Sequence, residues 1–396
     1  MLNSSSLYRF ILSSMLVLFL AEIILTGSGQ SIVIGGLSLR YLIFIVTSLW
    51  ALFFIALRLK IPKNSIIVII FIFYCLISLM LGIFGGGKSE FILMDFRSSF
   101  FILSFFFLYH CSKYTNFEKI VIETFKYCCG ILLTFHFSSL VLLYSGVDIY
   151  DFNLFQILKE DLVTYPLFYF YNGFVFYYIA FWYYYLTTSS HNKLLSFLYA
   201  CAVLLTFQRG FVLGLIVSFL VYFFVNAKSF YKKLILLFIV IAVIYAYYTI
   251  FSLVVVRDLA GSDSIRYENL NQVINNVNIF SFFFGHGFGI GVPIRPTHFE
   301  NVFLEIFHKQ GLIGLVLNAF ILYPIVYSLK YNTADSESHK IVTIFSYSSL
   351  SFLIISLTNP FYQNPLGLLV IELFYIQYFR AKLVKHSCSN ILTSPH

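Results

Sequence analysis

A succession of apolar runs, each close to the length of a membrane-crossing helix, is the feature that most constrains this sequence. A helix needs roughly 20 apolar residues to cross a bilayer, and backbone inside lipid must satisfy its own hydrogen bonds. The sequence therefore predicts an all-α, polytopic integral membrane protein with about twelve transmembrane helices in a single membrane domain, residues 1–396. The predicted spans are 8–26, 39–57, 65–83, 91–109, 120–145, 166–188, 193–208, 210–226, 233–256, 301–329, 340–359 and 366–380.

Composition excludes several other classes of protein. Charged residues make up 11% of the chain and hydrophobic residues 60%, whereas a soluble domain carries about 25% charged residues. Too little charge is present to cover a water-facing surface, which excludes a soluble enzyme or a disordered chain. The 6 cysteines include no CxxC pair, so we expect neither a disulfide framework nor a zinc site.

The basic residues predict the orientation in the membrane. Loops on the cytoplasmic side of a membrane protein carry an excess of Lys and Arg. With the spans above, sixteen of the 25 lysines and arginines fall on the side that holds both termini, and nine fall on the other. Both termini are therefore predicted to be cytoplasmic. The net charge of +8 is mainly a topology signal, and we expect no nucleic-acid partner.

Two longer loops are predicted on the outer side, at residues 146–165 and 257–298, the second with a short helix of its own. Most of the chemically capable residues lie in these loops, and loops on a rigid helical scaffold commonly carry function. Residues 387–396 are predicted to form a disordered cytoplasmic tail.

Two glycine-rich segments are open to more than one interpretation. Residues 82–89 fit the P-loop expression GxxxxGK[ST], but no strand precedes them, so nucleotide binding is not expected. Residues 285–291 carry glycine at every second position, which favours a turn with positive φ angles. The alternative is that bare backbone at Gly287 approaches a substrate phosphate.

Arginines on the outer side are candidates for binding an anion. Arg209 follows an apolar run, and an arginine at the edge of a membrane helix either reaches lipid headgroups or has a function. A guanidinium grips phosphate in a fork, so several arginines suit a diphosphate. The candidate diphosphate ligands are Arg209, Arg257, Arg266 and Arg295. The alternative partners for the loop arginines are Asp258, Asp263 and Glu268.

The segment 297–315 is the most informative, because it begins polar and runs into a membrane helix. Asn301, Glu305 and His308 are spaced to share one helical face. Glu305 and His308 form half of a di-iron motif, but no second copy is present, and we expect no metal. Glu300 is the candidate general base, with His298 as its alternative.

These motifs together resemble the O-antigen polymerase and O-antigen ligase family. The resemblance rests on Arg209-Gly210, Arg266-Tyr267, a short helix near 269–278, the glycines of 285–289, Glu300-Asn301, and Gly311 with Gly314. It implies glycan transfer from undecaprenyl diphosphate at the periplasmic face of a bacterial inner membrane, without metal or other cofactor. It also implies that Arg209 and Arg266 bind the diphosphate, and we expect substrate contacts from Tyr267, Asn301, Gly287 and Glu305.

One departure from the family pattern favours a polymerase. The ligases carry a histidine eleven residues before the first glycine of GxxG, and this chain has Glu300 at that position. We therefore expect an O-antigen polymerase that moves the growing glycan onto a new lipid-linked repeat unit. The expected partners are undecaprenyl-diphosphate-linked glycans, membrane lipids and a chain-length regulator protein. The alternatives are an O-antigen ligase acting on lipid A–core and, in another class, a flippase for lipid-linked oligosaccharides.

Overall fold

The structure is a computed structural model in which helices dominate. It describes residues 4–27, 33–34, 37–38, 42–49, 53, 66–147, 162–165, 168–187, 189–227, 229, 231, 233–235, 237–238, 241–242, 245, 249, 259–330 and 337–392. The helices are α1 (Ser4–Thr26), α3 (Ile66–Phe84), α4 (Ser89–Phe100), α5 (Ser104–Tyr114), α6 (Phe117–Tyr144), α8 (Tyr177–Tyr185), α9 (Ser190–Leu205), α10 (Arg209–Asn226), α12 (Leu259–Asn275), α13 (Ile279–Phe284), α14 (Val302–Ser328), α15 (Glu337–Ile355) and α16 (Pro365–Leu392). Two 3₁₀ segments join them, η2 (Phe101–Leu103) and η4 (Asn172–Phe176).

Six segments of the described chain are helical, long and apolar enough to cross a membrane. They are Ser6–Thr26, Ile66–Phe84, Ser89–Tyr114, Phe117–Tyr144, Arg209–Asn226 and Val302–Ser328. Each coincides with a predicted span, so the fold is consistent with a polytopic membrane protein. The predicted spans 39–57 and 233–256 lie largely outside the described residues, and the total of twelve stays a prediction.

Three sequence predictions need correction. The predicted span 166–188 begins as a strand: β3 (Leu162–Tyr165) pairs antiparallel with β4 (Phe168–Tyr171), and a second hairpin joins β1 (Val33–Ile34) to β2 (Leu37–Ser38). Aromatic residues such as those of β4 favour strands, and Gly173 interrupts a helix. The loop helix predicted near 269–278 is the longer α12. Helix α16 continues to Leu392, beyond the start of the predicted disordered tail.

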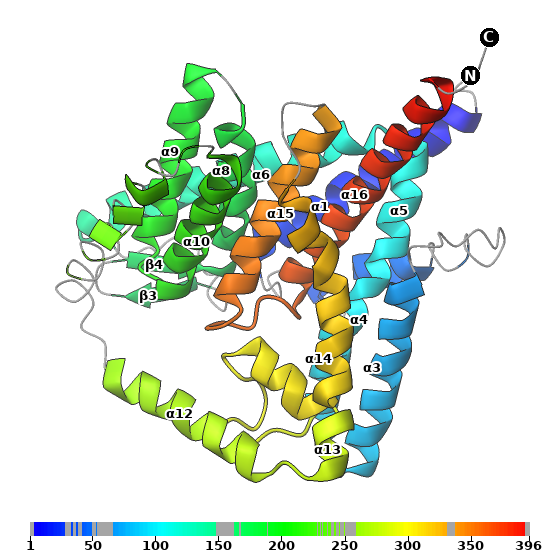
Figure 1. Cartoon of the computed structure of the whole chain (residues 1–396), viewed down its shortest axis with the longest axis vertical. Helices are drawn as coiled ribbons and strands as arrows, with labels where there is room; N and C mark the ends of the chain where they lie inside the picture. Colours follow the sequence, from blue (N-terminus) through cyan, green and yellow to red (C-terminus); the bar gives the residue numbers. More distant parts are fainter. Residues whose placement is uncertain are drawn as a thin grey trace.

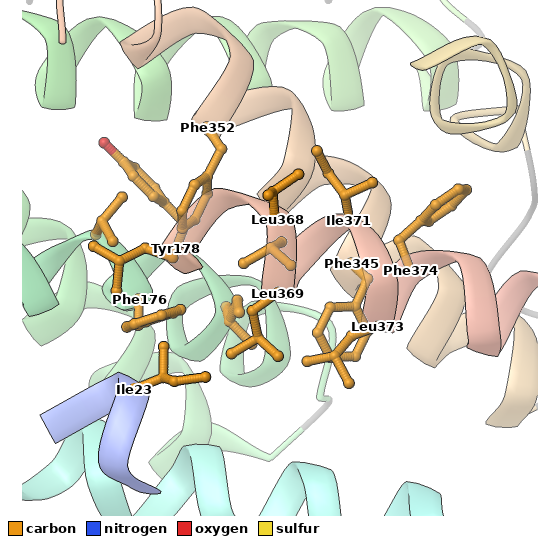
Figure 2. Close-up of a cluster of buried hydrophobic side chains, with 14 of the residues drawn as sticks. Ile23, Phe176, Tyr178, Phe345, Phe352, Leu368, Leu369, Ile371, Leu373 and Phe374 are labelled. Carbon is orange, nitrogen blue, oxygen red and sulfur yellow. The ribbon is translucent and has the colours of Figure 1, made fainter. Parts of the chain in front are cut away.

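The core lies where α15 and α16 pack among the other helices. Side chains from α1, η4, α8, α15 and α16 meet there, as Figure 2 shows for Ile23, Phe176, Phe352 and Leu369. Helix α15 carries buried small hydroxyl residues on more than one side, and small residues let membrane helices approach closely. Ser351 Oγ donates to Ser218 Oγ of α10 at 2.9 Å, and Ser346 Oγ lies 2.6 Å from Ser328 Oγ of α14.

The arrangement separates the termini from the loop helices. In Figure 1 both termini lie at the upper right, whereas α12 lies at the lower left and α13 at the bottom, beside the lower end of α3. The segment 259–301 therefore forms the end of the molecule opposite the termini. This is the relation expected if that segment is a loop on the outer side.

Candidate active site

The long helix α14 is broken at Gly311, and the break organises the region around it. Gly311 has φ 66° and ψ −167°, so the carbonyl groups that precede it lose their helical partners. Backbone carbonyls inside a membrane protein need other donors. His286 N donates to His308 O at 2.8 Å and Gly287 N to Lys309 O at 2.9 Å. Tyr74 Oη donates to Gln310 O at 2.6 Å.

The glycines of residues 285–291 let this loop pack backbone against backbone. Gly285, Gly287 and Gly289 have φ of 77°, 94° and 75°, which confirms the turn interpretation. A Cβ atom on Gly287 would lie 2.1 Å from the backbone nitrogen of Gly82, the first glycine of the P-loop-like segment. Because the Gly287 amide already donates to Lys309, the predicted substrate contact through that amide has no support in the structure.

A buried group of charges lies beside the break. The Lys309 side chain is 4% exposed, and its Nζ lies 2.8 Å from Asp95 Oδ1 and 2.5 Å from Glu305 Oε1. The same Nζ donates to Thr297 O at 2.7 Å, and Gly289 N donates to Asp95 Oδ2 at 2.7 Å. These bonds tie α4, α14 and the glycine loop together. Sequence reasoning gave Lys309 and Asp95 no role at this site, although the i,i+4 spacing of Glu305 and Lys309 was a usable signal.

His298 is oriented by this charged group. Its Nδ1 lies 3.1 Å from Glu305 Oε1 and 3.6 Å from Asp95 Oδ1. A carboxylate can only accept, so Nδ1 carries the hydrogen and Nε2 of the neutral ring is left as an acceptor. His298 also lines a cavity of about 160 Å³, together with Gln310 and Asn364. The arrangement can take a proton from a hydroxyl placed in that cavity.

The same carboxylates raise the question of a metal ion. Asp95, His298 and Glu305 each offer a ligand atom, and these atoms lie within 4.8 Å of one another. Lys309 Nζ already sits against both carboxylates and supplies a positive charge there. The second oxygen of Glu305 accepts from Phe299 N at 3.1 Å, so both of its oxygens have protein partners. The residues present fit an internal ion cluster better than a metal site or the predicted substrate contact by Glu305.

Glu300 is bridged by two of the predicted diphosphate ligands. Arg266 Nε lies 2.5 Å from Glu300 Oε2, and Arg295 Nη2 lies 2.5 Å from Glu300 Oε1. This partner differs from the acidic residues considered for these arginines in the sequence. The three side chains line a cavity of about 410 Å³, together with Tyr267 and Asn301. Both oxygens of the predicted base are thus occupied by guanidinium groups.

Three predicted residues remain: Asn301, Arg209 and Arg257. Asn301 caps α14: its Oδ1 accepts from Phe303 N at 3.0 Å and from Leu304 N at 3.1 Å. Arg209 is exposed at the first turn of α10, and its neighbour Gly210 faces Thr358. Leu357, next to Thr358 in the chain, lines the 410 Å³ cavity. Arg257 lies outside the described residues.

Two further histidines, His286 and His308, lie next to the glycine loop and the break in α14. The rings of His286 and His308 are 4.5 Å apart, and His308 also lies 5.4 Å from the ring of Phe299. Burial lowers the pKa of His286 and so favours the neutral form of its ring. Asn301, Glu305 and His308, which were predicted to share one face, have separate partners. Asn301 caps α14, Glu305 belongs to the ion cluster, and His308 packs against the rings of His286 and Phe299.

Two comparisons show which known proteins this chain resembles in sequence. Residues 194–319 match a family model described as O-antigen ligase. An O-antigen polymerase of Shigella flexneri is 25% identical over 385 residues, which cover 94% of this chain and 96% of the relative. The chain is therefore similar to O-antigen polymerases and ligases over most of its length. Together with the apolar helices, this similarity supports a multi-pass membrane protein and a glycosyltransferase-type enzyme.

The family match covers much of the candidate site and leaves part of it outside. The matched segment contains Arg209, Arg266, Arg295, His298 and Glu300, with the break in α14. Asp95 of α4 lies outside it, although Asp95 bonds both to Lys309 and to the glycine loop. In this chain the candidate site therefore also includes a residue of α4, outside the matched segment.

Proposed function

We propose that this protein is an O-antigen polymerase. It transfers a growing glycan from undecaprenyl diphosphate to the terminal sugar of a new undecaprenyl-diphosphate-linked repeat unit. The relative named O-antigen polymerase, aligned over nearly the whole chain, supports the polymerisation. The observation that supports the proposal most is that Arg266 and Arg295 both contact one anionic group, Glu300, in a cavity of about 410 Å³.

The two arginines are suited to hold the diphosphate leaving group. Guanidinium binds carboxylate and phosphate in the same geometry, so the Glu300 carboxylate and a diphosphate compete for the same donors. We propose that the donor displaces Glu300 from Arg266 and Arg295, with Arg209 as a further ligand from α10. Fixed positive charge then stabilises the negative charge that develops on the leaving group, and no metal is required.

His298 is better arranged than Glu300 to act as the base. Each Glu300 oxygen is bonded to an arginine, whereas the His298 ring is oriented through Nδ1 by Glu305 and has Nε2 as an acceptor. A carboxylate that orients an imidazole and stabilises its protonated form is a recurrent catalytic arrangement. The acid–base role therefore moves to the alternative residue of the sequence prediction.

The transfer step then balances as follows. The acceptor hydroxyl gives its proton to His298 Nε2 while its oxygen bonds to the anomeric carbon of the donor sugar. The bond from that carbon to the diphosphate oxygen breaks, and the electron pair leaves with undecaprenyl diphosphate. Two extended residues span about 7 Å, so His298 and Glu300 are close enough to serve the acceptor and the leaving group of one reaction.

We further propose that the site faces the periplasm from the inner membrane, with both termini in the cytoplasm and about twelve spans. The placement of 259–301 opposite both termini supports this orientation (Figure 1). In this orientation the protein binds its lipid-linked substrates and contacts a chain-length regulator on the periplasmic side. Attaching a topology reporter to each terminus and to the loop at 276–278 would test the orientation.

An O-antigen ligase is the second candidate, because the matching family model carries that description. A deletion strain separates the two. Loss of the polymerase leaves lipid A–core carrying one repeat unit, whereas loss of the ligase leaves bare core. Complementation with Arg266→Ala or Arg209→Ala should give the deletion phenotype with normal protein levels in the membrane. Full-length O-chains from both variants would refute the diphosphate role.

A further inference from the structure

A further cavity in the described part of the chain is lined by none of the residues of the candidate active site. It has a volume of about 850 Å³ and is lined by α1, the end of α5 and the first turns of α6. Helix α1 begins and helix α16 ends near this side, where the two termini lie in Figure 1. We refer to this cavity as the basic groove.

Positive charge is concentrated at one end of the basic groove. Arg9, Lys113 and Lys119 line it, and all three side chains are exposed. Among the described residues that line it, Glu123 is the acidic one, and its Oε1 lies 3.0 Å from Lys126 Nζ. The groove therefore presents a surplus of positive charge to whatever enters it.

Apolar surface continues from this charged end along the helices. On α1 the lining residues Arg9, Ser13, Val17 and Ala21 follow at intervals of four and so share one face. From Arg9 to Ala21 the helix rises about 18 Å, which is about three fifths of a hydrocarbon core of about 30 Å. On α6, Ile120 provides apolar surface opposite. One end of the groove thus suits an anionic headgroup and the rest suits an acyl chain.

We propose that the basic groove binds an anionic phospholipid of the bilayer. Arg9, Lys113 and Lys119 hold the phosphate headgroup, and one acyl chain lies along Val17 and Ala21. Basic pockets between membrane helices are known to recognise anionic headgroups. The length of the apolar face distinguishes a lipid from a free phosphate or a nucleotide, which would use only the charged end. The site is separate from the proposed transfer reaction and does not depend on it.

The experiment uses the full-length protein purified in detergent. Native mass spectrometry counts bound lipid during titration with phosphatidylglycerol and, separately, with phosphatidylcholine of the same acyl chains. The test variant is Arg9→Gln/Lys113→Gln/Lys119→Gln. The control Lys193→Gln/Lys233→Gln/Lys330→Gln removes the same charge from residues predicted on the same side of the membrane.

We expect the wild type and the control to prefer phosphatidylglycerol, and the groove variant to bind it about tenfold more weakly or worse. Equal binding of both lipids by the wild type, or an unchanged affinity in the groove variant, would overturn the proposal. So would displacement of the lipid by inorganic phosphate at millimolar concentration, because that outcome indicates a simple anion site.

A second measurement on the wild type covers the case in which the triple variant does not fold. A phosphatidylglycerol with a photoreactive acyl chain is activated on the intact protein, and the labelled peptides are sequenced. Labelling concentrated in 9–21 and 116–128 supports the groove. Labelling spread evenly over the apolar helices excludes it.

Discussion

Replacing Glu300 by Gln separates its two possible roles. If Glu300 occupies the arginines that bind the diphosphate, its removal frees them and the donor binds more tightly. If Glu300 is instead the general base, its removal abolishes turnover and leaves donor binding nearly unchanged. The substitution keeps the size of the side chain and removes its charge, so the cavity of about 410 Å³ is preserved.

The magnitude follows from the two ion pairs. The side chains of Arg266, Arg295 and Glu300 are 36%, 34% and 27% exposed, so solvent screens both interactions. A pair of this kind contributes about 0.5–1 kcal/mol. A donor that no longer has to break two of them gains about 1–2 kcal/mol, which corresponds to about 5- to 30-fold tighter binding.

The assay combines donor binding with polymerisation in liposomes. Binding of an undecaprenyl-diphosphate-linked repeat unit gives the donor affinity, and the ladder of products gives the turnover at saturating donor. Glu268→Gln is the matched control. It removes the same charge from α12, where Glu268 accepts a hydrogen bond from Gln272 at 2.8 Å and touches neither arginine in the described structure.

His298→Ala provides the opposite pattern. Loss of a general base costs about 10²- to 10⁴-fold in turnover, with donor affinity retained. Glu300→Gln should lose far less than this. A drop of 10²-fold or more in Glu300→Gln, without any gain in donor affinity, would refute both the competition argument and the assignment of His298.

Three further predictions concern stability, each measured by thermal unfolding in detergent. Gly311→Ala should lower the free energy of unfolding by at least about 1–3 kcal/mol, because φ is 66° and the new Cβ would lie 2.3 Å from backbone atoms. The control Gly130→Ala, with open space around it, should be neutral or slightly stabilising. Equal losses in the two variants would argue against the break in α14. Asn301→Ala should lower the free energy of unfolding by about 1 kcal/mol, because the helix cap is lost. Asn301→Asp keeps a capping oxygen and should lose much less. Identical unfolding of the two variants would contradict the cap. Lys309→Met should lower the free energy of unfolding by about 3–5 kcal/mol, because two buried carboxylates lose their lysine partner. The control Lys88→Met, at an exposed position, should leave the stability unchanged. An unaffected Lys309→Met would disprove the buried cluster.

Local sequence signals predicted where the helices lie better than they predicted strands or breaks within helices. The apolar runs placed α1, α3, α6, α10 and α14 to within a few residues, because length and hydrophobicity alone decide whether a segment can cross a bilayer. The same signal misread 166–188, since an aromatic-rich run satisfies both a strand and a helix. Gly311 was recognised as part of a motif, but a glycine in an apolar helix does not reveal whether the helix continues.

The sequence by itself indicated a chain built from membrane helices and singled out its arginines and the 297–315 segment as candidates for the chemistry. Only the tertiary structure decided which charges meet. Asp95 and Lys309 are 214 residues apart in the chain, and Arg266 and Glu300 are 34 apart. Ion pairs between such positions depend on how helices pack and where a loop folds back, which hydropathy and spacing do not encode. For that reason the sequence could name Glu300 and His298 as candidates, and the geometry was needed to give them different partners.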